Sequence, residues 1–132
     1  MLAINKNGNR IWKNEDGQLH RIDGPAVEYT NGDKKWYLNG RKHRIDGPAI
    51  EYGDGFKIWY LNDKLHRENG PAVEYSNGTK EWFVNGEKHR IDGPAYEGVD
   101  GTKDWCLNNK EYSEEEYKKK VKEYVKNRQR RK

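Results

Sequence analysis

Residues 36–49 read WYLNGRKHRIDGPA, and the second half of this stretch recurs along the chain at a fixed spacing. Its copies begin at His20, His43, His66 and His89, 23 residues apart each time, with Asn69 breaking the Asp series in the third. The tryptophans keep the same period, at Trp36, Trp59, Trp82 and Trp105. An internal period of this length indicates a repeat protein in which each unit packs mainly on its neighbours.

Turn residues divide each unit into strands. Asn31-Gly32 and Asn39-Gly40 are dipeptides favoured in two-residue hairpin turns, where both residues need positive φ. Residues 26–29 and 33–38 alternate and are rich in β-branched and aromatic side chains, as strands are. Asp23-Gly24-Pro25 then turns the chain again. Each unit is therefore predicted to be an antiparallel hairpin that leads into the next one.

The period changes after residue 112. Ser113 followed by Glu116 fits a capping box. One apolar stripe at helical spacing follows, made by Tyr117, Val121, Tyr124 and Val125. We expect this helix to fold back onto the last hairpin, with Cys106 replacing a large aromatic side chain to make room for Tyr117 and Val121.

The predicted fold is mainly β. It is an elongated single-layer antiparallel sheet of about four to five hairpin repeats with a C-terminal α-helix. We assign residues 1–132 to one domain, with hairpin repeats over 7–112, a capping helix over 113–128 and a basic tail over 129–132. At the other end, Leu2–Ile4 is expected to form an exposed edge strand through which two copies could pair as a homodimer.

Composition agrees with a thin, water-exposed fold. Hydrophobic residues make up 32% of the 132 residues and charged residues 36%, which is too polar for a thick core. Five Trp and nine Tyr argue against disorder. The single cysteine excludes an internal disulfide, and neither a signal peptide nor an apolar run of membrane-spanning length is recognisable, so a cytoplasmic location is predicted.

The positive charge is concentrated at one end. Residues 113–132 contain nine Lys or Arg against four Glu, whereas the rest contains 17 basic and 18 acidic residues. The balanced repeats are therefore poor candidates for binding nucleic acid. The basic end is the alternative contact for nucleic acid or an anionic membrane, through Lys126, Arg128, Arg130 and Arg131.

Strand alternation predicts two aromatic stripes on opposite faces. The Trp stripe is expected to be the structural spine of the sheet. The second stripe, Tyr37, Tyr60 and Phe83, is the better candidate for a contact surface, because exposed aromatic rows mark interaction sites.

The repeated His-Arg pairs do not predict catalysis. An active site needs chemically different groups that converge at a single place. Here the equivalent His and Arg residues stand roughly 10 Å apart along the sheet. The histidine spacing fits no zinc pattern, so neither a metal nor a cofactor is expected. We expect each His to pack beside an Asn-Gly turn and each Arg to pair with the Asp two residues later or a strand Glu.

These residues resemble a known family. The pattern Trp-Tyr-x-Asn-Gly-x-x-His-Arg-x-Asp-Gly-Pro-Ala is similar to a variant of the membrane occupation and recognition nexus (MORN) repeat, over about residues 7–112. The standard motif has Gly where this chain has Arg21, Arg44, Arg67 and Arg90, so a lipid-binding role is not carried over. The variant resembles proteins of bacteriophages and large DNA viruses.

Two functions follow as expectations. The first is a non-enzymatic protein-binding module, which the resemblance makes a viral accessory protein that inhibits a host defence protein in the host cytoplasm. Its candidate contact residues are Tyr37, Tyr60, Phe83, Arg44, Arg67 and Arg90. The second is a peripheral adaptor that binds nucleic acid or membrane through the basic helix. An enzyme is not expected.

Overall fold

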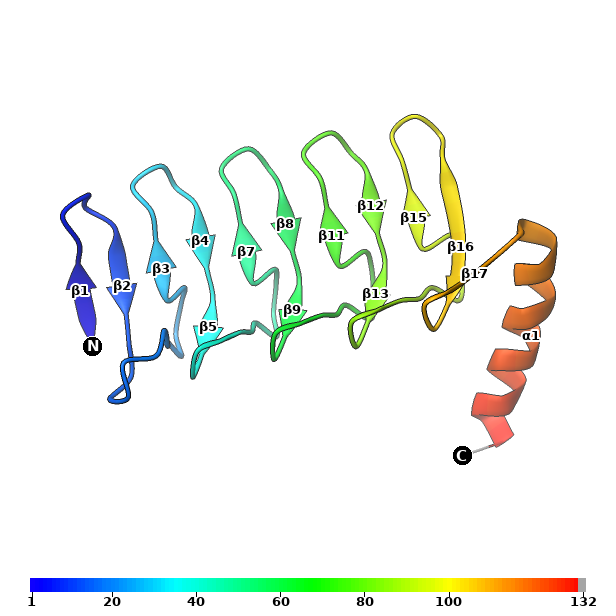
Figure 1. Cartoon of the computed structure of the whole chain (residues 1–132), viewed down its shortest axis with the longest axis horizontal. Coiled ribbons are helices and arrows are strands. Elements are labelled where there is room, and N and C mark those ends of the chain that lie inside the picture. Colours follow the sequence, from blue (N-terminus) through cyan, green and yellow to red (C-terminus); the bar gives the residue numbers. More distant parts are fainter. Residues whose placement is uncertain (131–132) are drawn as a thin grey trace.

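The computed structural model, which describes residues 1–130, is a row of antiparallel hairpins ending in one helix (Figure 1). The hairpins follow one another in chain order, and the first hairpin and the helix lie at opposite ends of the row. The predicted fold class, one large open antiparallel sheet of hairpins with a C-terminal helix, is confirmed.

Most strands belong to one sheet of eleven. In their order across this sheet they are β1 (Leu2–Ile4), β2 (Arg10–Trp12), β3 (Val27–Glu28), β4 (Lys34–Lys35), β7 (Ile50–Glu51), β8 (Lys57–Ile58), β11 (Val73–Glu74), β12 (Lys80–Glu81), β15 (Tyr96–Glu97), β16 (Lys103–Leu107) and β17 (Lys110–Tyr112). Three separate two-stranded pieces lie along its lower border, as oriented in Figure 1. They pair β5 (Tyr37–Leu38) with β6 (Arg41–Lys42), β9 (Tyr60–Leu61) with β10 (Lys64–Leu65), and β13 (Phe83–Val84) with β14 (Glu87–Lys88).

The two predicted turns of a unit differ in kind. Asn39 (φ 48°) and Gly40 (φ 79°) both have positive φ, as a two-residue turn requires. The prediction of the same turn at Asn31-Gly32 is wrong. There only Gly32 has positive φ (96°), and the Tyr29 N–H donates to Asp33 O across a longer loop.

The expected continuous strand over residues 33–38 is interrupted at Trp36. Its N–H donates to Ala49 O of the following repeat (2.7 Å), whereas its carbonyl accepts from His43 N–H of the return segment (3.2 Å). The chain therefore changes pairing partner at each Trp, from the large sheet to the small hairpin. Within the described residues β16 runs through its Trp as one strand, with Lys103 and Asp104 paired to β15 and residues 105–107 paired to β17.

The core is a line of small side chains. Four alanines, one per repeat, have no exposed surface: Ala26, Ala49, Ala72 and Ala95. Beside them Val27, Ile50 and Val73 are also buried. Since each repeat buries so little, stability must come mainly from contacts between neighbouring repeats.

The helix α1 (Glu114–Arg130) packs on the last hairpin, as predicted, with contacts to β16 and β17. Its start is the expected cap, because the Glu116 N–H donates to Ser113 Oγ (3.2 Å). It extends beyond the predicted end at residue 128, so residues 129–130 of the predicted tail are helical and 131–132 lie outside the described residues. No helix within residues 1–130 is long and apolar enough to span a membrane.

The first strand β1 lies at the border of the sheet and pairs only with β2. Leu2 and Ile4 are exposed on it (48% and 63%), which confirms the predicted edge strand. It forms the first hairpin with β2, so the repeated architecture begins before residue 7. Pairing of two copies through this edge stays a prediction.

Candidate functional site

The repeated arginines stack on the repeated tryptophans. In four repeats the guanidinium carbon lies over an indole ring, a cation–π arrangement. The distances from this carbon to the ring centroid are 3.8 Å for Arg21 on Trp12, 3.8 Å for Arg44 on Trp36, 3.9 Å for Arg67 on Trp59 and 3.8 Å for Arg90 on Trp82. We call the sheet face that carries these stacks the Trp face.

Each stacked arginine is held by its own loop. Arg44 donates from Nε to Asp46 (3.0 Å) and from Nη1 to Pro48 O and Glu51 (both 3.0 Å). The close approach requires Gly47, since a Cβ there would lie 2.8 Å from the guanidinium carbon. The predicted pairing of Arg with Asp and the strand Glu is confirmed. We call the segments 20–25, 43–48, 66–71 and 89–94 the HR loops.

The third HR loop differs from the others. Arg67 donates to Pro71 O (3.0 Å) and Glu74 (3.2 Å), but residue 69 is Asn and supplies no carboxylate. Glu68 lies instead beside His66, with 3.7 Å between Oε1 and Nε2. Arg67 therefore has one carboxylate partner fewer than Arg44 and Arg90 among the described residues, as the sequence suggested.

The histidines connect neighbouring repeats. Each Nδ1 accepts a backbone N–H from the turn of the following repeat, as the predicted packing beside this turn requires. The pairs are His20 with Asn39 (2.9 Å), His43 with Asn62 (3.1 Å), His66 with Asn85 (2.9 Å) and His89 with Asn108 (3.0 Å). Burial, and secondarily the charge of Arg128, lower the pKa of His89.

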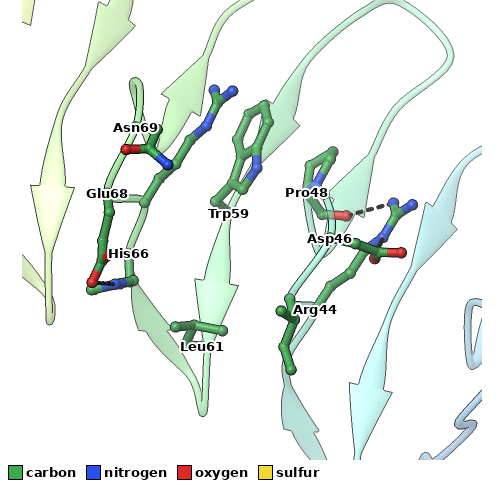
Figure 2. Close-up of a pocket in the computed structure, with 11 residues that line it drawn as sticks. Arg44, Asp46, Pro48, Trp59, Leu61, His66, Glu68 and Asn69 are labelled. Carbon is green, nitrogen blue, oxygen red and sulfur yellow. Dashed lines mark hydrogen bonds and ion pairs between the residues drawn. The ribbon is translucent and has the colours of Figure 1, made fainter.

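Between successive HR loops the Trp face is hollowed. One groove of about 700 Å³ lies between the loop of Arg44 and that of Arg67. Figure 2 shows Trp59 and Leu61 between Asp46 and Pro48 on one side and His66, Glu68 and Asn69 on the other. A second groove has Trp82 and Val84 in its wall, together with Tyr124 and Arg128 of α1. We call the space between an HR loop and the Trp of the next repeat a Trp slot.

The HR loops carry isoleucines that project into solvent. Ile22 is 87% exposed and Ile45 is 85% exposed, and Ile91, nearer the helix, is 41% exposed. Ile45 and Ile91 line the two grooves. These isoleucines were not among the predicted contact residues. The signal available in the sequence was an apolar residue repeated inside a Gly-Pro loop, with no strand or helix to bury it.

The structure places the aromatic residues and the arginines of the predicted contact set on opposite faces of the sheet. Trp59 with Leu61 and Trp82 with Val84 line the grooves, whereas Tyr60 and Phe83 do not, which agrees with the predicted alternation. The row of Tyr37, Tyr60 and Phe83 therefore faces away from Arg44, Arg67 and Arg90. Only 19–29% of the surface of these arginine side chains is exposed, and each side chain forms an ion pair with the strand Glu that follows its loop.

The aromatic row is itself packed. Tyr37, Tyr60 and Phe83 are half-buried, and the Lys42 Nζ lies 4.6 Å from the Tyr60 ring centroid. The Lys35 Nζ lies 5.4 Å from the Tyr29 ring centroid. Tyr52, Phe56 and Tyr75 stack in turn, with centroids 5.6 and 5.0 Å apart.

The end of the array is closed by α1 on the Trp face. Tyr117 is buried (3% exposed) and its ring lies 5.0 Å from that of Trp105. Its hydroxyl donates to Arg90 O and accepts from the Gly93 N–H (3.3 Å). The expectation that Cys106 makes room for Tyr117 does not hold, because Trp105 and Cys106 point to opposite faces of β16 and Tyr117 is on the side of Trp105.

Lys126 and Arg128 project from different sides of α1, because they are two residues apart on the helix. Arg128 lies over the Tyr124 ring (5.7 Å) and borders the second groove, whereas Lys126 is exposed elsewhere on α1. Arg130 is the last residue of α1, and Arg131 lies outside the described residues.

Among residues 1–130 no group of three or more His, Cys, Asp or Glu is placed to hold a metal ion. No family model matches the chain, and neither does any curated protein or solved structure. The resemblance to MORN repeats therefore stays a prediction, and function must be argued from the geometry of the two faces.

Proposed function

We propose that this chain is a non-enzymatic protein-binding module that contacts its partner with the Trp face. The observation that carries the proposal is the row of isoleucines on the HR loops. Ile22 and Ile45 leave more than four fifths of their surface in water, on loops that are otherwise well anchored. Apolar side chains aligned on one face, rather than scattered singly, are typical of interaction sites.

The grooves support the same face. Ile45 lines the first groove and Ile91 the second, and the HR loop between them carries Glu68 at the equivalent position. Trp59 and Trp82 contribute to the walls. Aromatic residues in such recesses are frequent binding hot spots, because a partner side chain can be fully desolvated there. Equivalent positions recur roughly every 10 Å, so an extended partner could contact several repeats at once.

Charge favours protein over nucleic acid as the partner. The HR-loop arginines are paired with carboxylates, for example Arg44 with Asp46 and Glu51, so they offer no unbalanced basic stripe to phosphates. The proposed partner is a host protein, with the viral, inhibitory role in the host cytoplasm following from the resemblance alone. The basic helix as a contact for nucleic acid or membrane remains the alternative prediction.

The proposal is tested by comparing the two faces in one binding experiment. The bait would be the full chain, as wild type, as Ile22→Ser/Ile45→Ser and as Tyr37→Ser/Tyr60→Ser. Proteins captured from cells of the host would be identified, purified and titrated against each bait by calorimetry. We expect a stoichiometric partner that the isoleucine variant loses and the tyrosine variant keeps. Loss only in the tyrosine variant, or equal binding by all three, would contradict the proposal.

A further inference from the structure

The last Trp slot of the array is filled, whereas the slots before Trp59 and Trp82 are open. Tyr117 lies between the HR loop of Arg90 and the ring of Trp105, which is the position of a Trp slot. The slots before Trp59 and Trp82 have the same walls, but in them the corresponding space is a groove. The molecule thus contains an occupied and an unoccupied form of one repeated recess.

The filled slot shows which groups recognise the occupant. The phenol ring packs on an indole, and its hydroxyl bridges two backbone groups of the loop, the Arg90 carbonyl and the Gly93 N–H. A hydroxyl can donate and accept at once, so a single oxygen satisfies both groups. A phenylalanine in this place would leave both without a partner.

The open slots present the same groups. The equivalents before Trp59 are the Arg44 carbonyl and the Gly47 N–H, and both residues line the groove. Neither backbone group has a hydrogen-bond partner among the described residues. Before Trp82 the pair is the Arg67 carbonyl and the Gly70 N–H, which are also without a partner within residues 1–130.

We infer that the Trp slots before Trp59 and Trp82 bind tyrosine side chains of the partner protein, with the phenol hydroxyl bridging the loop carbonyl and the glycine N–H as Tyr117 does in the last slot. Exposed Ile45 on the rim would cover part of the inserted ring. This inference rests on the proposed function, because it specifies what the Trp face recognises. It adds a requirement for the hydroxyl, which general apolar contact would not impose.

The test uses the full chain and p-cresol, the side-chain analogue of tyrosine, with toluene as the matched analogue of phenylalanine. Amide N–H shifts would be followed by NMR during each titration. We expect p-cresol to shift the Gly47 and Gly70 resonances saturably and to leave Gly93 unchanged, because Tyr117 already occupies that loop. Toluene should bind about five- to ten-fold more weakly, as the loss of a hydroxyl that satisfies two groups implies.

The variant Tyr117→Ala supplies a positive control, since p-cresol should then also shift Gly93 and raise the melting temperature. If p-cresol shifts the Gly93 resonance of Tyr117→Ala but leaves the Gly47 and Gly70 resonances of the wild type unchanged, the inference is overturned. Equal affinity for toluene would overturn it as well. If Tyr117→Ala does not fold, the wild-type titration still decides. If the isoleucine variant loses the partner but p-cresol does not bind the wild-type chain, the inference about tyrosine is wrong and the proposed function is retained.

Discussion

The inner repeats and the C-terminal end solve the same packing problem with different residues. In the inner repeats an arginine from the following HR loop covers each Trp ring, for example Arg67 on Trp59. At the end no further HR loop follows within the described residues, and Trp105 is covered by Tyr117 of α1, which lies on the side of the preceding HR loop. An open row of repeats exposes its last unit, and a terminal cap is needed to cover it.

In this comparison the C-terminal end serves stability, whereas the inner repeats leave space for binding. The arginine stack leaves the other side of the ring free and a groove beside it, whereas the helix fills that space and buries the tyrosine. The last Trp slot is therefore the filled equivalent of the slots that the inner repeats leave open to solvent.

Removing the buried ring of the cap should have the largest effect. Tyr117→Ala leaves a cavity against Trp105 and should lower the free energy of unfolding by about 3–5 kcal/mol. Tyr117→Phe keeps the ring but leaves the Arg90 carbonyl and the Gly93 N–H unpaired, for a loss of about 1–2 kcal/mol. Urea unfolding followed by circular dichroism measures both. Equal losses for the two variants would show that the hydroxyl contributes nothing.

Removing one stack inside the array should cost less. Arg44→Ala loses the cation–π contact with Trp36 and the bond to Pro48 O, and we expect a loss of about 1–2 kcal/mol in the free energy of unfolding. The control is Arg41→Ala, an exposed arginine on β6 in the same repeat, with a change within about 0.5 kcal/mol. The same urea titrations apply. A loss for Arg41→Ala as large as that for Arg44→Ala would contradict the role of the stack.

The junction between cap and array should make stability pH-dependent. The pKa of His89 is lowered in the folded chain, by burial first and by Arg128 second, with Glu87 acting in the opposite direction. Below the ordinary value of 6.5 the unfolded chain takes up a proton that the folded chain resists, so stability falls as the pH falls. His89→Gln should reduce this fall between pH 7.5 and 5, as measured by melting curves. An unchanged pH dependence in the variant would remove His89 as the cause.

The smallest effect concerns the irregular third loop. Asn69→Asp restores the carboxylate that Arg44 has in Asp46, and we expect a gain of about 0.2–1 kcal/mol, because the pair is exposed to solvent. The reverse change, Asp46→Asn, should lose about the same amount. Thermal unfolding at low and high salt measures both, and the gain should shrink as salt rises. A loss of stability in Asn69→Asp would mean that Asn69 has a structural role of its own.

Local periodicity predicted the architecture better than it predicted the surface. The repeat, the Asn39-Gly40 turn, the Arg–Asp pairs and the capping helix follow from short-range patterns, and the structure confirms them. The change of partner at Trp36 was not predictable, because it depends on Ala49 of the next repeat. The Trp slots were not predictable either, because alternation divides a strand into two faces but does not say which face neighbouring loops will hollow or cover.

Hydrogen exchange at three equivalent glycines tests the central comparison most directly. Gly47, Gly70 and Gly93 occupy the same position in their HR loops, and only the Gly93 N–H is bonded, to the Tyr117 hydroxyl, among the described residues. We predict that the Gly93 amide exchanges far more slowly than the other two in the free protein. Similar protection at all three glycines would mean that the inner slots are closed, and would contradict the account.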